Sequence, residues 1–304
     1  MSSSRPLWRD EWPLLVVWAS ALAWLLQGKA WIDGLSSLVG AAGFLVWVCL
    51  AILLSAFAVV RHADVLAERF GEPYGTMILT FAVISLEVFM ISALMLEGGQ
   101  PTLARDTMYS VIMIVLAGLV GLCLLLGGIK FHEQSFNLRG ANSYLSMIIP
   151  LAAIGLVLPD FTRSSPYQVF SPPHAVALVI LSVAVYSVFL IVQTSRYRGF
   201  FSVPAETEGL HPHVESSRSN FLHAALLIIY IVPVVLLAKK LAGVLDFTTE
   251  ASGLPVAFGG LIVATLILAP EGLSAVQSAL NNQLQRSVNI LLGSVLATIG
   301  LTIP

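Results

Sequence analysis

The chain has 304 residues, of which 57% are hydrophobic and 11% are charged, and its formal net charge at pH 7 is -2. A soluble globular protein has about 25% charged residues, so this composition excludes a soluble domain and indicates an integral membrane protein. The sequence has neither a basic patch interleaved with aromatic residues nor a phosphate-binding loop, so we expect no nucleic-acid partner.

The apolar segments predict an all-α polytopic membrane protein whose main partner is the lipid bilayer. A spanning helix needs about 20 mostly apolar residues, and nine segments meet this measure. The predicted spans are residues 12–28, 35–60, 75–96, 105–128, 143–159, 173–194, 220–243, 254–280 and 287–304.

Three further signals lie within the spans or next to them. Residues 61–73 are amphipathic, which predicts a short surface helix that ends at Gly71 and Pro73. In the fifth span, Pro150 and Pro159 predict a kink and an exit. The seventh span leads through Lys239 and Lys240, near its predicted end, to the eighth.

The polar loop 195–219 divides the chain into an N-terminal half, residues 1–194, and a C-terminal half, residues 220–304. It contains His211 and His213 beside glutamates. A His-x-His pair can bind a metal or sense pH, although a solvated linker is the simpler interpretation.

Basic residues are distributed unequally between the two sides of the membrane. The N-terminus and the loops after the even-numbered spans hold ten Lys and Arg residues, whereas the other side holds five. The positive-inside rule therefore predicts a cytoplasmic N-terminus. The first apolar run could also be read as a signal peptide, but Trp8, Trp12, Trp24 and Trp31 are typical of interfacial anchors and favour a span.

A single carboxylate, Glu87, lies in the middle of the third span. Placing a charged side chain at the bilayer centre costs about 2.5 to 3.5 kcal/mol on the mildest scales, so such a residue is a functional candidate. A shift of 184 positions places Glu87 on Glu271 in the eighth span, and Gly75 on Gly259. The chain therefore contains two related segments, residues 71–128 and 254–304.

The two segments form a predicted inverted repeat. The third and eighth spans are five spans apart, so they cross the membrane in opposite directions. In secondary transporters with this architecture, the substrate and ion site lies near the midplane between the repeats. We therefore expect Glu87 and Glu271 to converge there as cation and proton ligands. Pro270 predicts a helix break beside Glu271 that frees backbone carbonyl oxygens.

Paired carboxylates suit the exchange of a hard cation for protons. Two ionised carboxylates neutralise one divalent ion and supply up to four of the six to eight oxygens that calcium prefers. Without a cation, desolvation disfavours the charged form, so proton and cation compete for the same oxygens. Serine and threonine hydroxyls near either glutamate are candidate secondary ligands, although each more often bonds to its own helix. They are Thr80, Ser85, Ser110, Ser294 and Thr298.

These motifs carry a family resemblance. The stretches GEPYGTMILTFAVISLEV, PTLARDTMYSVIMIVLAGLVGLCLLLGG and APEGLSAVQSALNNQLQRSVNILLGSVLATIGLTIP resemble the two repeats of bacterial ChaA-type calcium (sodium, potassium)/proton antiporters, in the calcium/cation antiporter superfamily. The resemblance implies eleven helices in two inverted halves and a bacterial inner-membrane location. It also implies cation efflux driven by inward proton movement, with Glu87 and Glu271 as ligands and no cofactor besides the transported Ca2+, Na+, K+ and H+.

The sequence departs from the family pattern in two ways. Vacuolar exchangers of the superfamily have Gly-Asn-x-x-Glu in each repeat, whereas this chain has Val83-Ile84 and Ile267-Leu268 at those positions. The preferred cation therefore stays open, as do the proton stoichiometry and the oligomeric state. Similar proteins continue for about two more helices, so we interpret the chain as truncated at its C-terminus.

Three alternatives follow. The chain could be a Na+(K+)/H+ antiporter without calcium preference, a non-transporting homologue with a structural or regulatory role, or an intramembrane enzyme. The enzyme is disfavoured, because no two histidines have helical i, i+4 spacing inside a span. The six histidines are His62, His132, His174, His211, His213 and His223.

Overall fold

The computed structural model describes residues 11–71, 74–97, 103–161, 171–195, 197–201, 219–255 and 257–302. Within these ranges the chain is helical apart from short connections. It folds as two compact units, each built from both predicted halves of the sequence. The first unit consists of Met1–Leu103 and His213–Pro270, and the second of Ala104–Pro212 and Glu271–Pro304.

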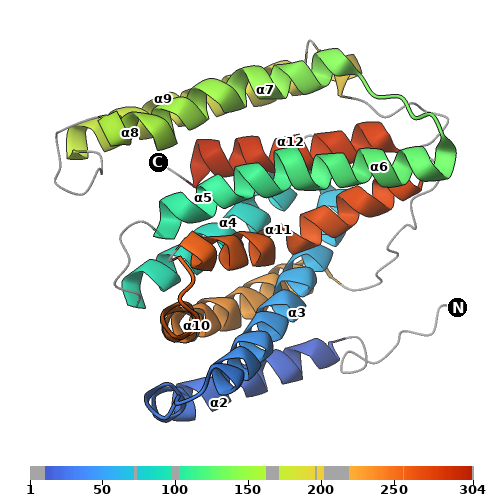
Figure 1. The fold of residues 1–304 in the computed structure, drawn as a ribbon. Coiled ribbons are helices and arrows are strands. Elements are labelled where there is room, and N and C mark those ends of the chain that lie inside the picture. Colours follow the sequence, from blue (N-terminus) through green and yellow to red (C-terminus); the bar gives the residue numbers. More distant parts are fainter. Residues whose placement is uncertain are drawn as a thin grey trace, which may run out of the picture. The chain divides into compact units, whose positions relative to one another are not determined.

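The predicted number of spans is confirmed. Among the described residues, nine helical stretches are long and apolar enough to cross a membrane. In chain order (Figure 1) the first three are α2 (Trp12–Asp33), α3 (Leu38–Phe70) and α4 (Tyr74–Glu97). The fourth consists of α5 (Leu103–Met113), η1 (Ile114–Leu119) and α6 (Val120–Phe131), and the fifth of α7 (Leu138–Ala152) and η2 (Ala153–Val157), which α8 (Leu158–Phe161) continues. The last four are α9 (Pro172–Thr194), α10 (Asn220–Ser252), α11 (Ala257–Leu280) and α12 (Leu284–Leu301).

Serine side chains cap the two longest helices at their N-termini. The Ser37 hydroxyl accepts a hydrogen bond from the Gly40 N–H at 3.2 Å, at the start of α3. The Ser219 hydroxyl accepts one from the Leu222 N–H at 3.3 Å, at the start of α10. Each cap satisfies an N–H that has no partner inside the helix. The polar connections before these helices therefore fix where the helices begin.

The prediction of a separate surface helix at residues 61–73 is wrong. Helix α3 continues without interruption to Phe70 and has 33 residues. A helix of this length is about 50 Å long, which exceeds the hydrocarbon core of about 30 Å. The sequence becomes polar where the helix leaves the apolar layer, while its backbone stays helical. The predicted end at Gly71 is confirmed, with φ 63° and ψ -179°.

The same physical reason moves the end of the seventh predicted span. Lys239 and Lys240 lie inside α10, which runs to Ser252 and not only to residue 243. Helix α10 also has 33 residues, so its polar end extends beyond the apolar stretch. Hydropathy therefore identified the membrane-crossing part of each helix and not its full length.

In the first unit, α3 packs along α10, and α2 and α4 pack against both (Figure 1). The hydroxyl of Ser55 on α3 donates a hydrogen bond to the Tyr230 carbonyl oxygen of α10 at 2.7 Å, and both residues are fully buried. An interhelical hydrogen bond of this kind fixes the rotation of the two helices about their axes.

Trp24, which the sequence suggests as an anchor at the membrane interface, is buried in an aromatic cluster of the protein. It is 1% exposed, and its ring centroid lies 5.1 Å from that of Trp31, 5.3 Å from that of Phe44 and 5.8 Å from that of Trp47. The first two pairs have an edge-to-face geometry that aromatic rings favour. The cluster joins α2 to α3.

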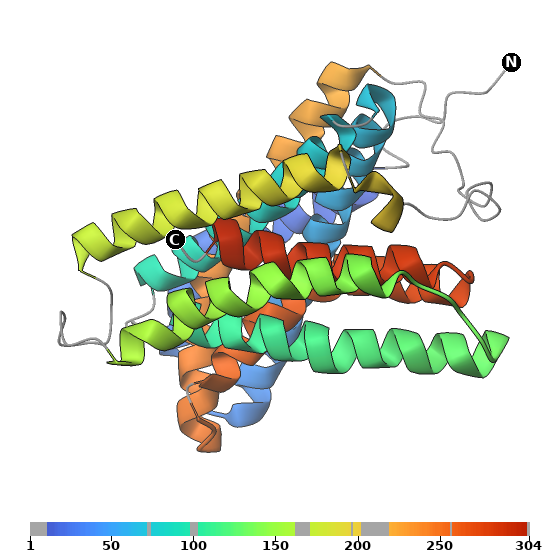
Figure 2. The same ribbon diagram turned by 90° about the horizontal axis from the view of Figure 1, so that it is seen from above.

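In the second unit, α12 lies among α6, η1, α7 and α9 (Figure 2). Gly300 and Gly293 of α12 face Tyr186 of α9 and Tyr144 of α7 at ordinary contact distance. A Cβ atom at Gly300 would lie 3.5 Å from the Cβ atom of Tyr186, and one at Gly293 would lie 3.7 Å from the Tyr144 hydroxyl oxygen. Helix α12 is therefore the centre of this unit.

Two π-helical segments interrupt the second unit's helices. Segment η2 begins three residues after Pro150, in the fifth span, so the predicted irregularity is confirmed there. Pro150 lacks the N–H that would continue the hydrogen-bond pattern. The Leu156 carbonyl of η2 accepts a hydrogen bond from the Tyr109 hydroxyl at 3.0 Å, which ties η2 to α5. Pro159 lies in α8, which ends at Phe161.

We expect Gly71→Ala to lower the free energy of unfolding by about 1 to 3 kcal/mol, because its backbone conformation is strained for any residue with a Cβ atom. Unfolding in detergent measures the change. Gly43→Ala, in the second turn of the same helix and with open space around its Cβ position, is the matched control and should be neutral or stabilising by up to about 1 kcal/mol. Equal behaviour of the two variants would contradict the assigned cap.

Candidate functional site

Glu87 lies in the interior of α4, and the residue is only 1% exposed. Leu86, which precedes it on the helix, and Met90 and Ile91, which follow it, are buried as well. A carboxylate in such surroundings is costly unless it is protonated, hydrogen-bonded or paired with a cation. Glu87 is therefore suited to bind a proton or a cation.

Two of the candidate ligands share α4 with Glu87, and they lie on different faces. Thr80 precedes Glu87 by seven residues, so it lies on the same face, about 10 Å away along the helix axis. Ser85 precedes Glu87 by two residues, which corresponds to a rotation of about 200°. Thr80 therefore shares the face of Glu87, and Ser85 does not.

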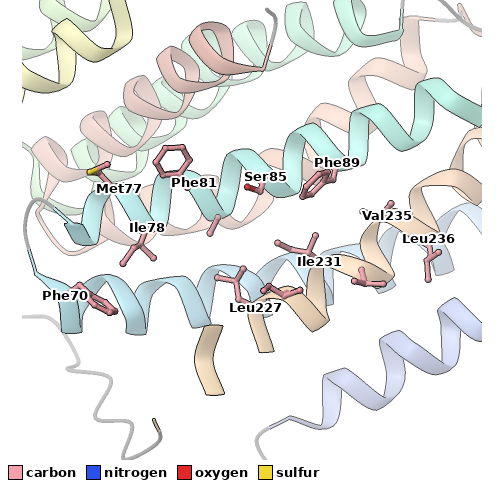
Figure 3. A pocket seen from close by; sticks show the side chains of 13 residues that line it. Phe70, Met77, Ile78, Phe81, Ser85, Phe89, Leu227, Ile231, Val235 and Leu236 are labelled. Carbon is pink, nitrogen blue, oxygen red and sulfur yellow. The ribbon is translucent and has the colours of Figure 1, made fainter. Parts of the chain in front are cut away.

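The structure places Ser85 on a groove of about 940 Å³ in the first unit (Figure 3). Side chains of α4 and α10 line the groove, with Phe70 at one end, and Ser85 is the one polar residue among those that line it. The groove thus offers a single hydroxyl to a cation, far fewer oxygens than a calcium ion requires.

Glu271 lies on α11 and is partly exposed. The Ser294 hydroxyl of α12 donates a hydrogen bond to Oε2 of Glu271. Thr298 is one turn further along the same face of α12 and is 3% exposed. The second unit therefore brings together two of the predicted ligands, Glu271 and Ser294, and the third, Thr298, lies one turn further along α12.

The surroundings of Glu271 include a close contact with the π-helical segment η1. A Cβ atom at Gly272 would lie 3.1 Å and 3.3 Å from the two δ-carbons of Leu119. Single-turn π segments occur frequently at functional sites. Segment η1 thus packs against α11 at the residue that follows Glu271.

Two other predicted features have local structural explanations. The Ser110 hydroxyl donates to the Asp106 carbonyl oxygen of its own helix at 2.8 Å, which is the common arrangement for a serine in a helix. Pro270 lies inside α11, which is helical without interruption from Ala257 to Leu280, so the predicted helix break is wrong. Because proline has no N–H, the Leu266 carbonyl four residues earlier lacks its usual intrahelical donor.

The convergence of the two glutamates stays a prediction. Glu87 belongs to the first unit and Glu271 to the second. Among the described residues, there is no group of three or more His, Cys, Asp or Glu side chains with metal-binding geometry. The predicted loop ligands His211 and His213 lie outside the described residues.

One cluster of ionisable residues is missing from the sequence-based predictions. His62 on α3 and His223 on α10 lie with their Nδ1 atoms 2.9 Å apart, and 161 positions separate them in the sequence. Glu11 and Arg61 lie beside them. A search for i, i+4 pairs inside one helix cannot find a pair formed by two helices. The available signal was that both histidines lie near helix ends predicted to be on the same side of the membrane.

Comparisons with known proteins agree with the resemblance seen in the sequence. The profile of the sodium/calcium exchanger protein family matches residues 40–195. The sodium-potassium/proton antiporter ChaA of Escherichia coli (strain K12) is 48% identical over 260 residues, which cover 84% of this chain and 70% of that protein. A protein of Sinorhizobium fredii is 40% identical over 307 residues, which cover 100% of this chain and 81% of that protein.

Solved structures share the fold. The crystal structure of the Ca2+/H+ antiporter protein YfkE, with selenium substituted, superposes with a TM-score of 0.68 at 19% identity, and the match covers 96% of this chain and 80% of that chain. The predicted all-α exchanger architecture is thereby confirmed.

We expect Gly272→Val to destabilise the protein by about 1 to 3 kcal/mol, because its methyl groups would displace Leu119. Adding Leu119→Ala should recover a large part of this loss in a double-mutant cycle measured by unfolding in detergent. Gly128→Val, at a position with open space around the Cβ atom, is the control and keeps the helical context. Additive losses in the cycle would show that Gly272 and Leu119 do not pack together.

Proposed function

This chain belongs to the sodium/calcium exchanger family, and from that premise we propose that it is a secondary antiporter that exports Ca2+ in exchange for protons through Glu87 and Glu271. The homologues are transporters, and we propose no enzymatic reaction and no cofactor. The observation that carries the proposal is that each repeat has an ionisable carboxylate inside a membrane-spanning helix, one buried and one hydrogen-bonded to a hydroxyl.

The coupling follows from competition for the same oxygens. A cation that binds the two carboxylates neutralises them, and so does protonation of both groups. Either loaded state removes most of the cost of holding charge in low dielectric, whereas an empty pair of anions carries the full cost. Only the loaded states therefore change their access from one side of the membrane to the other, which links cation export to proton entry.

The ligand set bears on which cation is transported. Two carboxylates provide up to four oxygens, and the hydroxyls of Ser294 and Thr298, backbone carbonyls and water would complete the six to eight that calcium prefers. A Na+(K+)/H+ antiporter is the second candidate. The name of the E. coli relative favours it, as does the lack of an asparagine at Val83-Ile84 and Ile267-Leu268. YfkE is named as a Ca2+/H+ antiporter, which favours calcium.

The direction of transport depends on topology. We propose a location in the bacterial inner membrane with a cytoplasmic N-terminus, supported by the excess of Lys and Arg in the loops assigned to that side. We further propose that residues 71–128 and 254–304 are inverted repeats, so that Glu87 and Glu271 reach the midplane from opposite directions.

We expect Glu87→Gln and Glu271→Gln each to reduce exchange by more than about tenfold, because an amide neither carries the charge nor exchanges the proton, and a loss of about 1.4 kcal/mol is already tenfold. Collapse of a proton gradient in everted vesicles, on addition of calcium, sodium or potassium, measures the rate and identifies the ion.

Glu133→Gln, an exposed carboxylate outside the spans, is the control and should exchange like the parent. Full activity in either intramembrane variant would rule out a paired-carboxylate mechanism. No collapse with the parent chain, at normal membrane insertion, would favour the non-transporting homologue.

We expect Ser294→Ala to raise the half-saturating cation concentration by about three- to tenfold, because one hydrogen bond to Glu271 contributes about 0.5 to 1.5 kcal/mol. Ser294→Thr keeps the hydroxyl and should restore affinity. The matched control is Ser110→Ala, whose hydroxyl bonds to its own helix. An equal effect of both alanine variants would show that Ser294 acts only through packing.

A further inference from the structure

A second group of buried ionisable residues lies in the first unit, where α2 and α10 begin and α3 approaches its end. Glu11, His62, His223 and Tyr230 are 6%, 1%, 3% and 0% exposed, respectively. None of them is part of the proposed exchange site. Burying this many polar groups is costly unless they bond to one another, so their mutual contacts decide what the cluster does.

Glu11, the residue before α2, is the centre of the cluster. Its Oε2 atom lies 2.7 Å from Nη2 of Arg61 and 3.4 Å from Nε2 of His62. It also accepts a hydrogen bond from the Tyr230 hydroxyl at 2.9 Å. Burial raises the pKa of the Glu11 carboxyl, but the hydrogen bond with His62, the charge of Arg61 and the Tyr230 hydroxyl outweigh burial and lower it to about 2. Glu11 is therefore an anion at every physiological pH.

The two imidazole rings constrain each other's protonation. Their Nδ1 atoms are 2.9 Å apart, and a hydrogen bond between them requires that one atom carries a hydrogen and the other does not. With both rings neutral, one hydrogen lies between the Nδ1 atoms. One additional proton is compatible with this contact, because the second ring can stay neutral and accept. Two additional protons would place two N–H groups against each other and break the contact.

Proton uptake changes the net charge of a buried cluster. With neutral rings, Glu11 and Arg61 balance to zero. With one added proton the cluster has a net positive charge, which either imidazole ring can carry. If His62 carries it, this charge lies close to that of Arg61, because Nε2 of His62 is 3.4 Å from Nη2 of Arg61. Histidine is the side chain whose charge ordinarily changes between about pH 5 and 8. Glu11 attracts the added proton and Arg61 repels it, so the cluster has an attractive and a repulsive contact for the same charge.

The neighbouring elements add few other charges. On α4, which also packs against α3, Glu87 is the only ionisable residue between positions 77 and 96. Apart from Tyr230, the remaining titratable residues of α2 and α10 begin at Lys29 and Lys239, about four turns or more from Glu11 and His223, respectively. On α3 itself, the remaining charged residues near the cluster are exposed: Asp64, Glu68 and Arg69.

We propose that the His62–His223 pair, with Glu11 as its counter-ion, is a proton-binding site distinct from Glu87 and Glu271, which takes up one proton and thereby changes the packing of α2 against α3 and α10. The contacts make this consequence direct, because the groups that hold the start of α2 in place are the ones whose charge balance changes. Arg61, with a side chain that is 42% exposed, can leave the cluster most easily. Acidification therefore shifts the contact of Glu11 from Arg61 toward protonated His62, and a higher pH reverses this shift.

The test compares the full-length parent with the double variant His62→Asn/His223→Asn. Asparagine keeps a hydrogen-bonding side chain at both positions and does not titrate. Thermal unfolding in detergent and cation-driven proton-gradient collapse in everted vesicles are both measured from pH 5.5 to 8.5. We expect the parent to show a pH-dependent transition in the unfolding temperature that the double variant lacks, while maximal exchange is retained. The control is His174→Asn, an exposed histidine on α9, which should keep the parent's profile.

Two charge variants separate a proton site from a merely structural cluster. Glu11→Gln should move the midpoint of the profile toward lower pH by about one unit or more, and Arg61→Gln should move it toward higher pH, because an opposite charge nearby favours the protonated ring and a like charge disfavours it. Opposite displacements support the proposal. The same pH dependence in the parent and the double variant, or displacements in one direction, would overturn it.

The unfolding measurement needs no transport, so it tests the site even if the proposed exchange fails. If the double variant does not fold, the two charge variants, each of which keeps both histidines, decide the question through the position of the midpoint. A parent without exchange but with a pH-dependent unfolding transition that the double variant lacks would contradict the proposed function and support the proton site.

Discussion

Holding a carboxylate inside an apolar helix is the physical constraint on which the rest of this protein depends. Glu87 is 1% exposed in a span without another ionisable residue between positions 77 and 96. Lipid supplies no hydrogen bonds, so the surrounding chain must be helical and must satisfy its own backbone. The charge itself needs a proton or a cation, which is the reason why we propose Glu87 as a site of ion exchange.

Hydroxyls inside the helices differ in the partners that they bind. Ser294 and Ser110 both lie in membrane-spanning helices, but one donates to a carboxylate of another helix and the other to its own backbone. The two residues look alike in the sequence. Their roles separate only when α11 and α12 pack together, because the partner of Ser294 is 23 positions away.

Much of the architecture could be predicted from the sequence, because apolar runs of spanning length determine where helices cross a membrane. The polar ends of α3 and α10 could not be predicted, since hydropathy indicates which residues lie in the lipid layer and not how far the helix extends beyond it. The different faces of Ser85 and Glu87 were available from helical periodicity alone. The His62–His223 pair was not, because it requires knowing that α3 and α10 are neighbours. The positions of Trp24 and Ser294 depend on tertiary packing in the same way.

The distance in sequence between α3 and α10 also has a consequence for biosynthesis. Translation proceeds at about 5 to 20 residues per second, and 161 positions separate His62 from His223, so His62 exists for about 8 to 30 seconds before its partner is made. During that interval α3 enters the bilayer with Ser55 and His62 still lacking their α10 contacts. Assembly of the first unit must therefore wait for the second half of the chain, which supplies α10 and the first part of α11.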